Sequence, residues 1–171
     1  MSAWLQLPQK EKDEVWDRFY DRFSFHPSMH EEHWPGIREP VPCLTYSIAD
    51  AFTGDEAVDK AVEADLHTTA LAAFRQVVLP SEHLYALDWQ HNCFRFYPHH
   101  EFPAHDADAW AVPVLPNGDY YIFLGPDFSF GTFGHPWESS ICIFGKPMLA
   151  AFERFRPKIF TRLLRRDGRV P

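Results

Sequence analysis

Long apolar runs are missing from this chain of 171 residues. No stretch approaches the roughly 18 apolar residues that a membrane-spanning helix needs. The first residues, MSAWLQLPQKEKDE, also lack the basic start and the following apolar stretch of a signal peptide. These absences exclude a membrane-spanning protein and predict a cytoplasmic one.

Cysteine is scarce. Only Cys43, Cys93 and Cys142 occur, and no two of them form a CxxC pair. An odd number of cysteines in a chain without a signal peptide makes a poor disulfide framework. We therefore expect three reduced, buried thiols.

The familiar catalytic motifs are absent as well. The sequence holds no GxSxG turn, no Walker phosphate loop, no GxGxxG segment after a strand and no HExxH pair. This excludes the usual hydrolase, nucleotide-binding and zinc-protease signatures, although an unfamiliar enzyme stays open. We predict no cofactor.

Basic residues are few outside the C-terminal end. The segment up to Gly145 carries 22 acidic and eight basic residues, whereas Lys146 to Pro171 carries eight basic and two acidic ones, within a net charge of -8. Such an asymmetry indicates either a contact with an acidic partner or a terminal helix whose basic face lies against the acidic body. The overall acidity argues against a nucleic-acid partner.

Aromatic residues are abundant, at 16% of the chain, and predict a core rich in rings within one domain, residues 1–171. Apolar residues recur at helical spacing in three segments: 10–23, 55–79 and 147–166, the last bent at Pro157. Strand character is found in six: 43–48, 83–97 with an irregularity at His91 or Asn92, 110–115, 120–124, 128–133 and 139–144. The predicted class is α+β, with an antiparallel β-sheet (a meander of about five to six strands) flanked by N-terminal, central and C-terminal helices.

The best site candidate is the segment from Asn117 to Phe144, which sets acidic residues and a histidine among rings and turn glycines. Its neighbours along the chain include DWQH, residues 88–91. Acid–base chemistry needs a histidine beside a carboxylate, and the candidates for it are Asp88, His91, Asp119, His135 and Glu138. The candidates for a binding surface are Trp89, Tyr120, Tyr121, Asp127 and Trp137.

Structural roles explain the same residues individually. Asp119 and Asp127 can close turns through hydrogen bonds to the backbone, and His135 can cap a loop. Asp88 can pair with a nearby donor such as Arg95. Only the mutual geometry of these side chains separates the two interpretations.

Two histidine clusters could also bind a metal. One contains His26, His30 and His33, but Pro27 interrupts the helix that would align them. The other contains His99, His100, Glu101, His105, Asp106 and Asp108. Because nothing fixes the spacing of either cluster, we predict no metal site.

Four segments resemble a bacterial family known only as domain of unknown function 2716: FSFHPS, WPGIREPVPCLTYSI, YALDWQHNCFRFYPH and NGDYYIFLGPDFSFGTFGHPWESSICIFG. The resemblance covers most of the chain and implies a single-domain, cytoplasmic bacterial protein, but no catalytic residue. More loosely, the acidic, ring-rich chain is similar to immunity proteins that neutralise bacterial toxins by occlusion.

The leading functional hypothesis is a protein-binding module that sequesters a partner, such as a basic toxin, through acidic and aromatic residues. The alternative is a small-molecule enzyme or resistance protein with an aromatic-lined pocket, in which His91 or His135 acts as a base. A third hypothesis, an oligomeric structural component, would require a large exposed apolar patch.

Overall fold

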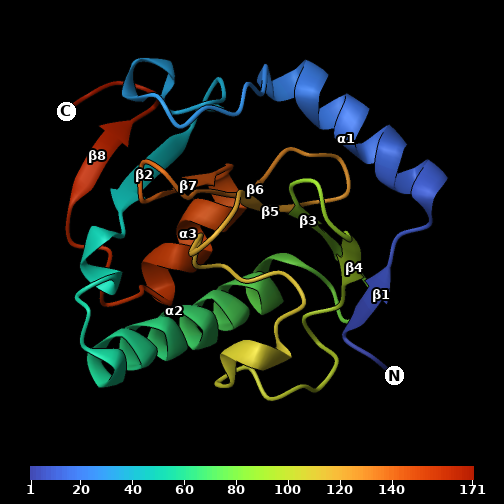
Figure 1. Cartoon of the computed structure of the whole chain (residues 1–171). Helices are drawn as coiled ribbons and strands as arrows, with labels where there is room; N and C mark the ends of the chain where they lie inside the picture. Colours follow the sequence, from blue (N-terminus) through green and yellow to red (C-terminus); the bar gives the residue numbers. More distant parts are fainter.

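One antiparallel sheet forms the centre of the molecule in the computed structural model, which describes residues 1–171 (Figure 1). Its eight strands are arranged in the order β1-β4-β3-β5-β6-β7-β2-β8. They are β1 (Trp4–Gln6), β2 (Cys43–Ser47), β3 (Leu84–Asp88), β4 (Phe94–Phe96), β5 (Tyr121–Leu124), β6 (Gly131–His135), β7 (Ser140–Phe144) and β8 (Leu163–Arg166). The first and last strands of the chain therefore form the two edges of the sheet.

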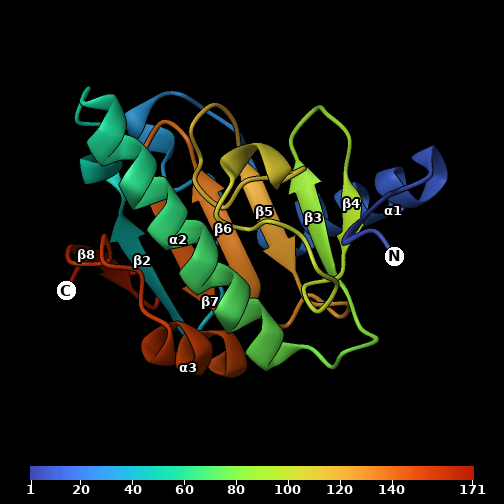
Figure 2. The ribbon, with the colours of Figure 1, turned by 90° about the horizontal axis from the view of Figure 1, so that it is seen from below.

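Three helices cover the two faces of the sheet (Figures 1 and 2). Helix α1 (Gln9–Phe23) packs on one face, and α2 (Glu56–Val77) and α3 (Lys146–Arg154) pack on the other. We call these the α1 face and the α2 face. The α2 face buries a core cluster of 26 residues and the α1 face one of 16.

The helices form where apolar periodicity and capping agree. In α1, Val15, Phe19 and Phe23 lie on one stripe and are buried against the sheet. At the start of α2, the Asp55 carboxylate accepts hydrogen bonds from the backbone N–H groups of Ala57 and Val58, at 3.1 and 3.2 Å. No helix of the fold is both long and apolar enough to cross a membrane.

The predicted α+β class with an antiparallel sheet is confirmed, but the sheet has eight strands. The segment 83–97 is not one strand: it is the hairpin of β3 and β4, with a turn at the predicted irregularity. Residues 110–115 form no strand, because Pro113 and Pro116 lack the N–H groups that a central strand must donate.

The predicted C-terminal helix over 147–166 is also too long. Helix α3 ends at Arg154, ahead of Pro157, and the chain returns to the sheet as β8. The basic residues of this segment therefore do not share one helix face. All three cysteines are free and buried, as expected.

Candidate functional site at one end of the sheet

Most of the predicted site residues lie at a single end of the sheet. Strand β3 ends there at Asp88, β5 begins there at Tyr121, and the turn from β6 to β7 follows His135. This end is at the top of Figure 2 and faces the viewer in Figure 1. We call it the sheet-end surface, formed by residues 26–34, 88–92, 117–120 and 135–139 together with Tyr20.

The carboxylate–histidine group of Asp88, His91 and Asp119 is the most concentrated polar feature of this surface. The Nδ1 atom of His91 lies 2.8 Å from Asp88 Oδ1 and 3.5 Å from Asp119 Oδ2. The tight β3–β4 turn places the imidazole there, since the His91 N–H donates to the Asp88 carbonyl at 3.1 Å. The sequence predicts all three as candidates; the β3–β4 turn brings His91 to Asp88, and the pairing of β3 with β5 brings Asp119 beside them.

The protonation of this group follows from its environment. Burial raises the pKa of both Asp88 and Asp119 above the ordinary value. The hydrogen bond that its Nδ1–H donates to the Asp88 carboxylate raises the pKa of His91, which is itself exposed. The group can hold a proton between its members. One imidazole nitrogen and one oxygen from each carboxylate also lie within 4.8 Å of one another, which is close enough to share a divalent cation.

Replacing Asp88 with asparagine is expected to lower the pKa of His91, because the amide keeps the shape of the side chain and removes its charge. A pH titration of the His91 ring by NMR measures this change. Asp119→Asn is the matched comparison and should have the smaller effect, since its oxygen lies farther from the same nitrogen. An unchanged His91 titration in both variants would show that the three groups are not coupled in solution.

Aromatic side chains continue the sheet-end surface beyond this group. The Trp89 indole N–H donates to the Tyr20 hydroxyl at 3.0 Å, and the Trp34 indole N–H donates to the Ser28 carbonyl at 3.3 Å. Trp137 is 52% exposed. These hydrogen bonds hold Trp34 and Trp89 in fixed orientations at the surface.

Tyr120 lies beneath these rings and is itself buried. Its hydroxyl accepts a hydrogen bond from the Ser28 N–H at 3.0 Å and donates one to the Ser28 carbonyl at 3.2 Å. Its ring centroid lies 5.6 Å from that of Trp89 and 4.9 Å from that of His135. The sequence predicts Tyr120 as a binding residue, and this prediction is wrong: the side chain is buried and supports the surface from beneath.

His135 caps the β6–β7 turn from the α1 face. Its Nδ1 accepts hydrogen bonds from the backbone N–H groups of Trp137 and Glu138, at 3.2 and 3.0 Å. Burial lowers its pKa to about 4, so the ring is neutral at ordinary pH. It lies on the opposite face of the sheet from Asp88, which removes it as a partner for that carboxylate.

Glu138 is bound within an ion-pair network centred on Arg165. The Arg165 guanidinium donates to both oxygens of Glu138, at 2.8 and 2.6 Å, and to Glu39 Oε1 at 2.5 Å. Ser140 donates a further hydrogen bond to Glu138 at 2.6 Å, and Thr45 donates one to Glu39. We call this the Arg165 network, and its role is structural. Sequence reasoning missed it because Glu39 and Arg165 are 126 positions apart.

Two of the predicted binding residues lie elsewhere. Tyr121 is half-buried against the core of the α2 face. Asp127 lies in the β5–β6 turn at the opposite end of the sheet, where its carboxylate accepts hydrogen bonds from Ser129. The turn-closing role considered for Asp127 is confirmed. The pairing of Asp88 with Arg95 is wrong, because Arg95 forms its ion pair with Glu11.

Neither histidine cluster converges on a metal-binding geometry. His99 and His100 each hydrogen-bond a backbone carbonyl, those of Val78 and Ser2, both at 2.9 Å. The rings of His30 and His33 lie 6.0 Å apart in the short turn around Glu31–His33. That turn contributes the exposed acids Glu31 and Glu32 to the sheet-end surface, a contribution that the sequence did not reveal.

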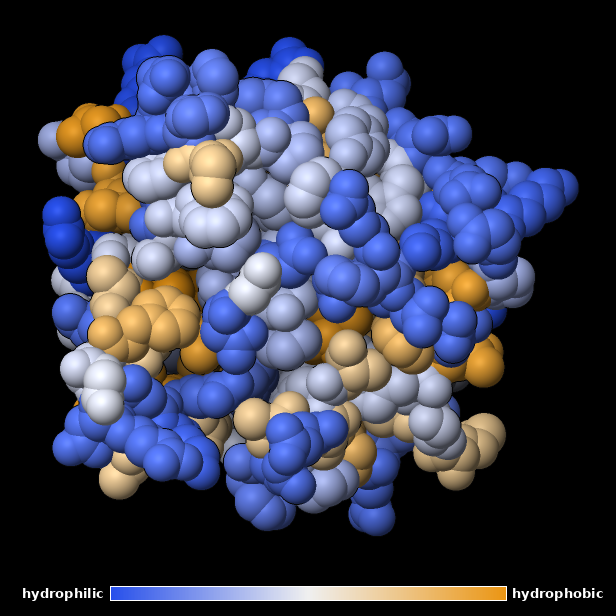
Figure 3. Space-filling view, viewed as in Figure 1, coloured by the Kyte–Doolittle hydropathy of each residue, from blue (hydrophilic) through white to orange (hydrophobic).

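Figure 3 shows the molecule from this end. Hydrophilic residues predominate on this face, and the strongly apolar residues form small, separate patches among areas of intermediate hydropathy. A broad apolar face of the kind expected for an oligomeric structural component is not seen from this side.

Comparison with known proteins places the chain in a family. The family model described as "Protein of unknown function (DUF2716)" matches residues 6–149. The chain is also 35% identical over 162 residues to the uncharacterized protein YxiI of Bacillus subtilis (strain 168), which covers 94% of this chain and 98% of the relative. No solved structure matches the chain.

Proposed function

Since the chain belongs to the DUF2716 family, whose description names no activity, we propose a function from the sheet-end surface: the protein is a cytoplasmic binding module that sequesters a basic protein partner, in the manner of bacterial immunity proteins. The observation that carries the proposal is the combination, on one surface, of accessible aromatic rings and carboxylates. The rings are Tyr20, Trp34, Trp89 and Trp137, and the carboxylates are Glu31, Glu32, Asp88 and Asp119.

The chemistry of these residues suits a protein interface. Tyrosine and tryptophan are the residue types that most often dominate binding energy at interfaces, because they bury large areas with few rotatable bonds. The hydrogen bonds of Trp34 and Trp89 already hold their rings in place, so binding costs little further side-chain entropy. Carboxylates around the rings accelerate the encounter with a basic partner.

Trp137→Ala tests the proposal directly. The variant is expected to weaken partner binding by about 2 kcal/mol, or roughly thirtyfold in Kd, because an exposed tryptophan at the centre of an interface is a typical hot spot. The partner is first captured from an extract of the native host with the unaltered protein and identified by mass spectrometry. Its affinity for the purified variants is then measured by calorimetry.

Leu79→Ala is the matched control. Leu79 is 64% exposed but lies beyond the end of α2, at the opposite end of the sheet. The proposal also requires affinity to fall with rising salt, since charge complementarity is screened. It would be rejected if Trp137→Ala and Leu79→Ala bound the captured partner equally well, or if that partner were acidic.

The hydrogen bond between Asp88 and His91 supports a second candidate function, acid–base catalysis on a small molecule. Removing one member of such a pair, as in Asp88→Asn, typically lowers turnover by about a hundredfold or more. Trp137→Ala should leave that turnover nearly unchanged. A panel of chromogenic esters and phosphate esters provides the measurement, and hydrolysis that survives Asp88→Asn would exclude this pair as the catalyst.

A further inference from the structure

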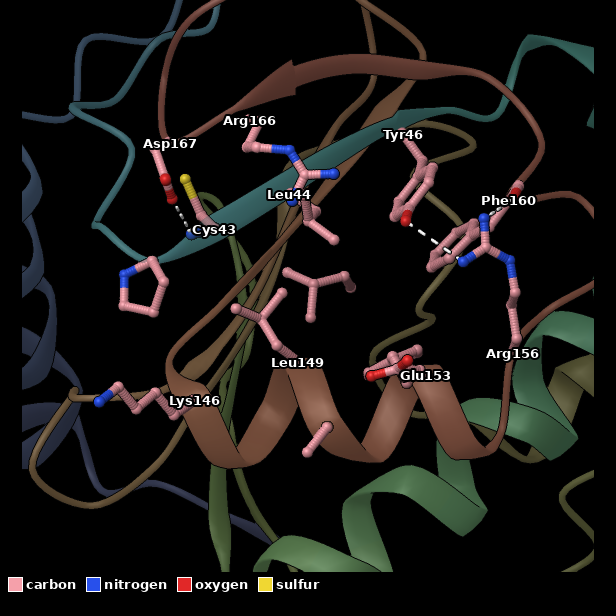
Figure 4. Close-up of a pocket in the computed structure, with 14 residues that line it drawn as sticks. Cys43, Leu44, Tyr46, Lys146, Leu149, Glu153, Arg156, Phe160, Arg166 and Asp167 are labelled. Atoms are coloured by element: carbon pink, nitrogen blue, oxygen red, sulfur yellow. Dashed lines mark hydrogen bonds between the residues drawn. The ribbon is translucent and has the colours of Figure 1, made fainter. Parts of the chain in front are cut away.

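A cavity of about 600 Å³ lies between α3 and strands β2 and β8 (Figure 4). It is on the α2 face, near the end of the sheet opposite the sheet-end surface. Its volume falls within the range of roughly 300 to 1,000 Å³ that is typical of small-molecule sites. The proposed protein interface does not use it.

The floor of the cavity is apolar. Leu44 from β2, Ile143 from β7 and Leu149 from α3 line it. Tyr46 and Phe160 form an aromatic wall, with their rings stacked at 4.6 Å and an interplanar angle of 8°. Such a lining favours a ligand with an apolar body.

Three cations surround this floor: Lys146, Arg156 and Arg166. None of them has a carboxylate partner within 4.0 Å, even though the chain carries 24 acidic and only 16 basic residues. The contrast with Arg165 is direct. It precedes Arg166 in β8, points to the other face and is fully paired there.

Arg156 is held in position at the cavity. One terminal nitrogen of its guanidinium donates to the Tyr46 hydroxyl at 3.3 Å, and the other donates to the Phe160 carbonyl at 2.5 Å (Figure 4). Each of these nitrogens carries a second hydrogen, which leaves donors for a ligand. No acidic side chain neutralises this guanidinium.

Two acidic residues also line the cavity. The Asp167 carboxylate is engaged, since it accepts a hydrogen bond from the Cys43 N–H at 2.9 Å. Glu153 lies on α3, at the rim of the cavity. The lining therefore retains more positive than negative charge.

We propose that this cavity binds a small organic anion with an apolar body, held by its carboxylate between Arg156 and Arg166 while its hydrocarbon part lies on the apolar floor. Guanidinium groups pair with carboxylates through charge-assisted hydrogen bonds. Desolvation of the hydrocarbon adds affinity in proportion to the apolar area that it buries.

Decanoate is the test ligand, and decanol is the neutral control with the same chain length. Binding is measured by calorimetry and by displacement of the fluorescent anion anilinonaphthalene sulfonate. Decanoate is expected to bind at least about tenfold more tightly than decanol, the amount expected from one lost charge-assisted contact. Equal affinity for the two ligands, or no binding of either, would overturn the proposal.

Arg166→Gln and Arg156→Gln locate the site. Each is expected to weaken decanoate binding about tenfold, whereas Arg169→Gln, which removes the same charge outside the cavity, should not change it. Arg156 also contacts Tyr46 and Phe160, so circular dichroism and thermal melting are used to check that Arg156→Gln is folded. If it is not, Arg166→Gln still decides the test, because Arg166 is exposed. The same affinity in Arg166→Gln and Arg169→Gln would place the anion elsewhere and refute the assignment.

Discussion

Replacing Arg165 with alanine is expected to lower the free energy of unfolding by about 3 to 5 kcal/mol, the typical cost of removing one partner from a buried ion pair. The reason is the burial of the two carboxylates that Arg165 neutralises. The side chains of Glu39 and Glu138 are only 2% and 8% exposed. Without the guanidinium, both negative charges would remain in the protein interior with no compensating cation.

Urea denaturation followed by circular dichroism measures this loss, which corresponds to roughly 10 °C in Tm for a chain of this size. Arg166→Ala is the matched control: it removes a neighbouring charge that forms no ion pair and should cost about 0.5 kcal/mol or less. Equal stability of the two variants would show that the Arg165 network contributes nothing.

The pH dependence provides a second check on the same network. Burial raises the pKa of Glu138, but hydrogen bonds from Arg165 and Ser140 outweigh it and hold the pKa below its usual value. A depressed pKa means that the stabilisation is present above the unfolded pKa and is lost as the pH falls through the folded one. The difference in the free energy of unfolding between the unaltered protein and Arg165→Ala should therefore become smaller as the pH falls.

Acid is expected to destabilise the protein as the pH falls below about 6.5, because two histidines are buried in neutral form. Burial lowers the pKa of His67 and of His135 from 6.5 to about 4. Below the unfolded value, the unfolded chain binds protons that the folded chain does not, so the free energy of unfolding falls between these two values. The loss is about 3 kcal/mol for each histidine when the pH reaches the folded pKa.

Isosteric variants separate this effect from general acid sensitivity. His67→Gln places an oxygen where Nε2 accepts the Val114 N–H, and His135→Asn places one where Nδ1 accepts the turn N–H groups. In each variant, the free energy of unfolding should fall less steeply as the pH is lowered. Urea unfolding from neutral pH to about pH 5 measures this dependence. His91→Gln should do the opposite, since the raised pKa of His91 stabilises the folded state in acid. If the free energy of unfolding fell as steeply with pH in His67→Gln and in His135→Asn as in the unaltered protein, the two buried histidines would not be the cause of the acid sensitivity.

The helices could be predicted from the sequence because their apolar residues recur at helical spacing over several turns. The edge strands could not, since β1 and β8 are short and carry little alternation; β1 is mostly exposed, and β8 is half-buried at three of its four residues. The apolar segment 110–115 was misassigned because burial does not require a strand. Val114 is buried, and its N–H donates at 3.0 Å to the His67 side chain and not to a neighbouring strand.

The candidate site could be predicted only in part, for a geometric reason. One end of neighbouring antiparallel strands holds Asp88, His91 and Asp119. The strands and turns that the sequence predicts are compatible with this arrangement. Which face each side chain takes depends on strand register, and a shift of one residue reverses it. Register separates His135 from Asp88, whereas Glu138 reaches Arg165 from the β6–β7 turn. The sequence suggests neither arrangement.

The position of β2 in the sheet also sets the order in which the protein can assemble. This strand lies between β7 and β8, so the ribosome delivers its two neighbours after every other strand of this sheet. Until β7 emerges, a nascent chain holds β2 without a partner on either side, and Glu39 stays without its cation until Arg165 follows. Because contacts between such distant positions are slow to form, we expect the β2 side of the sheet to form last, after β7 and β8 have both been synthesised.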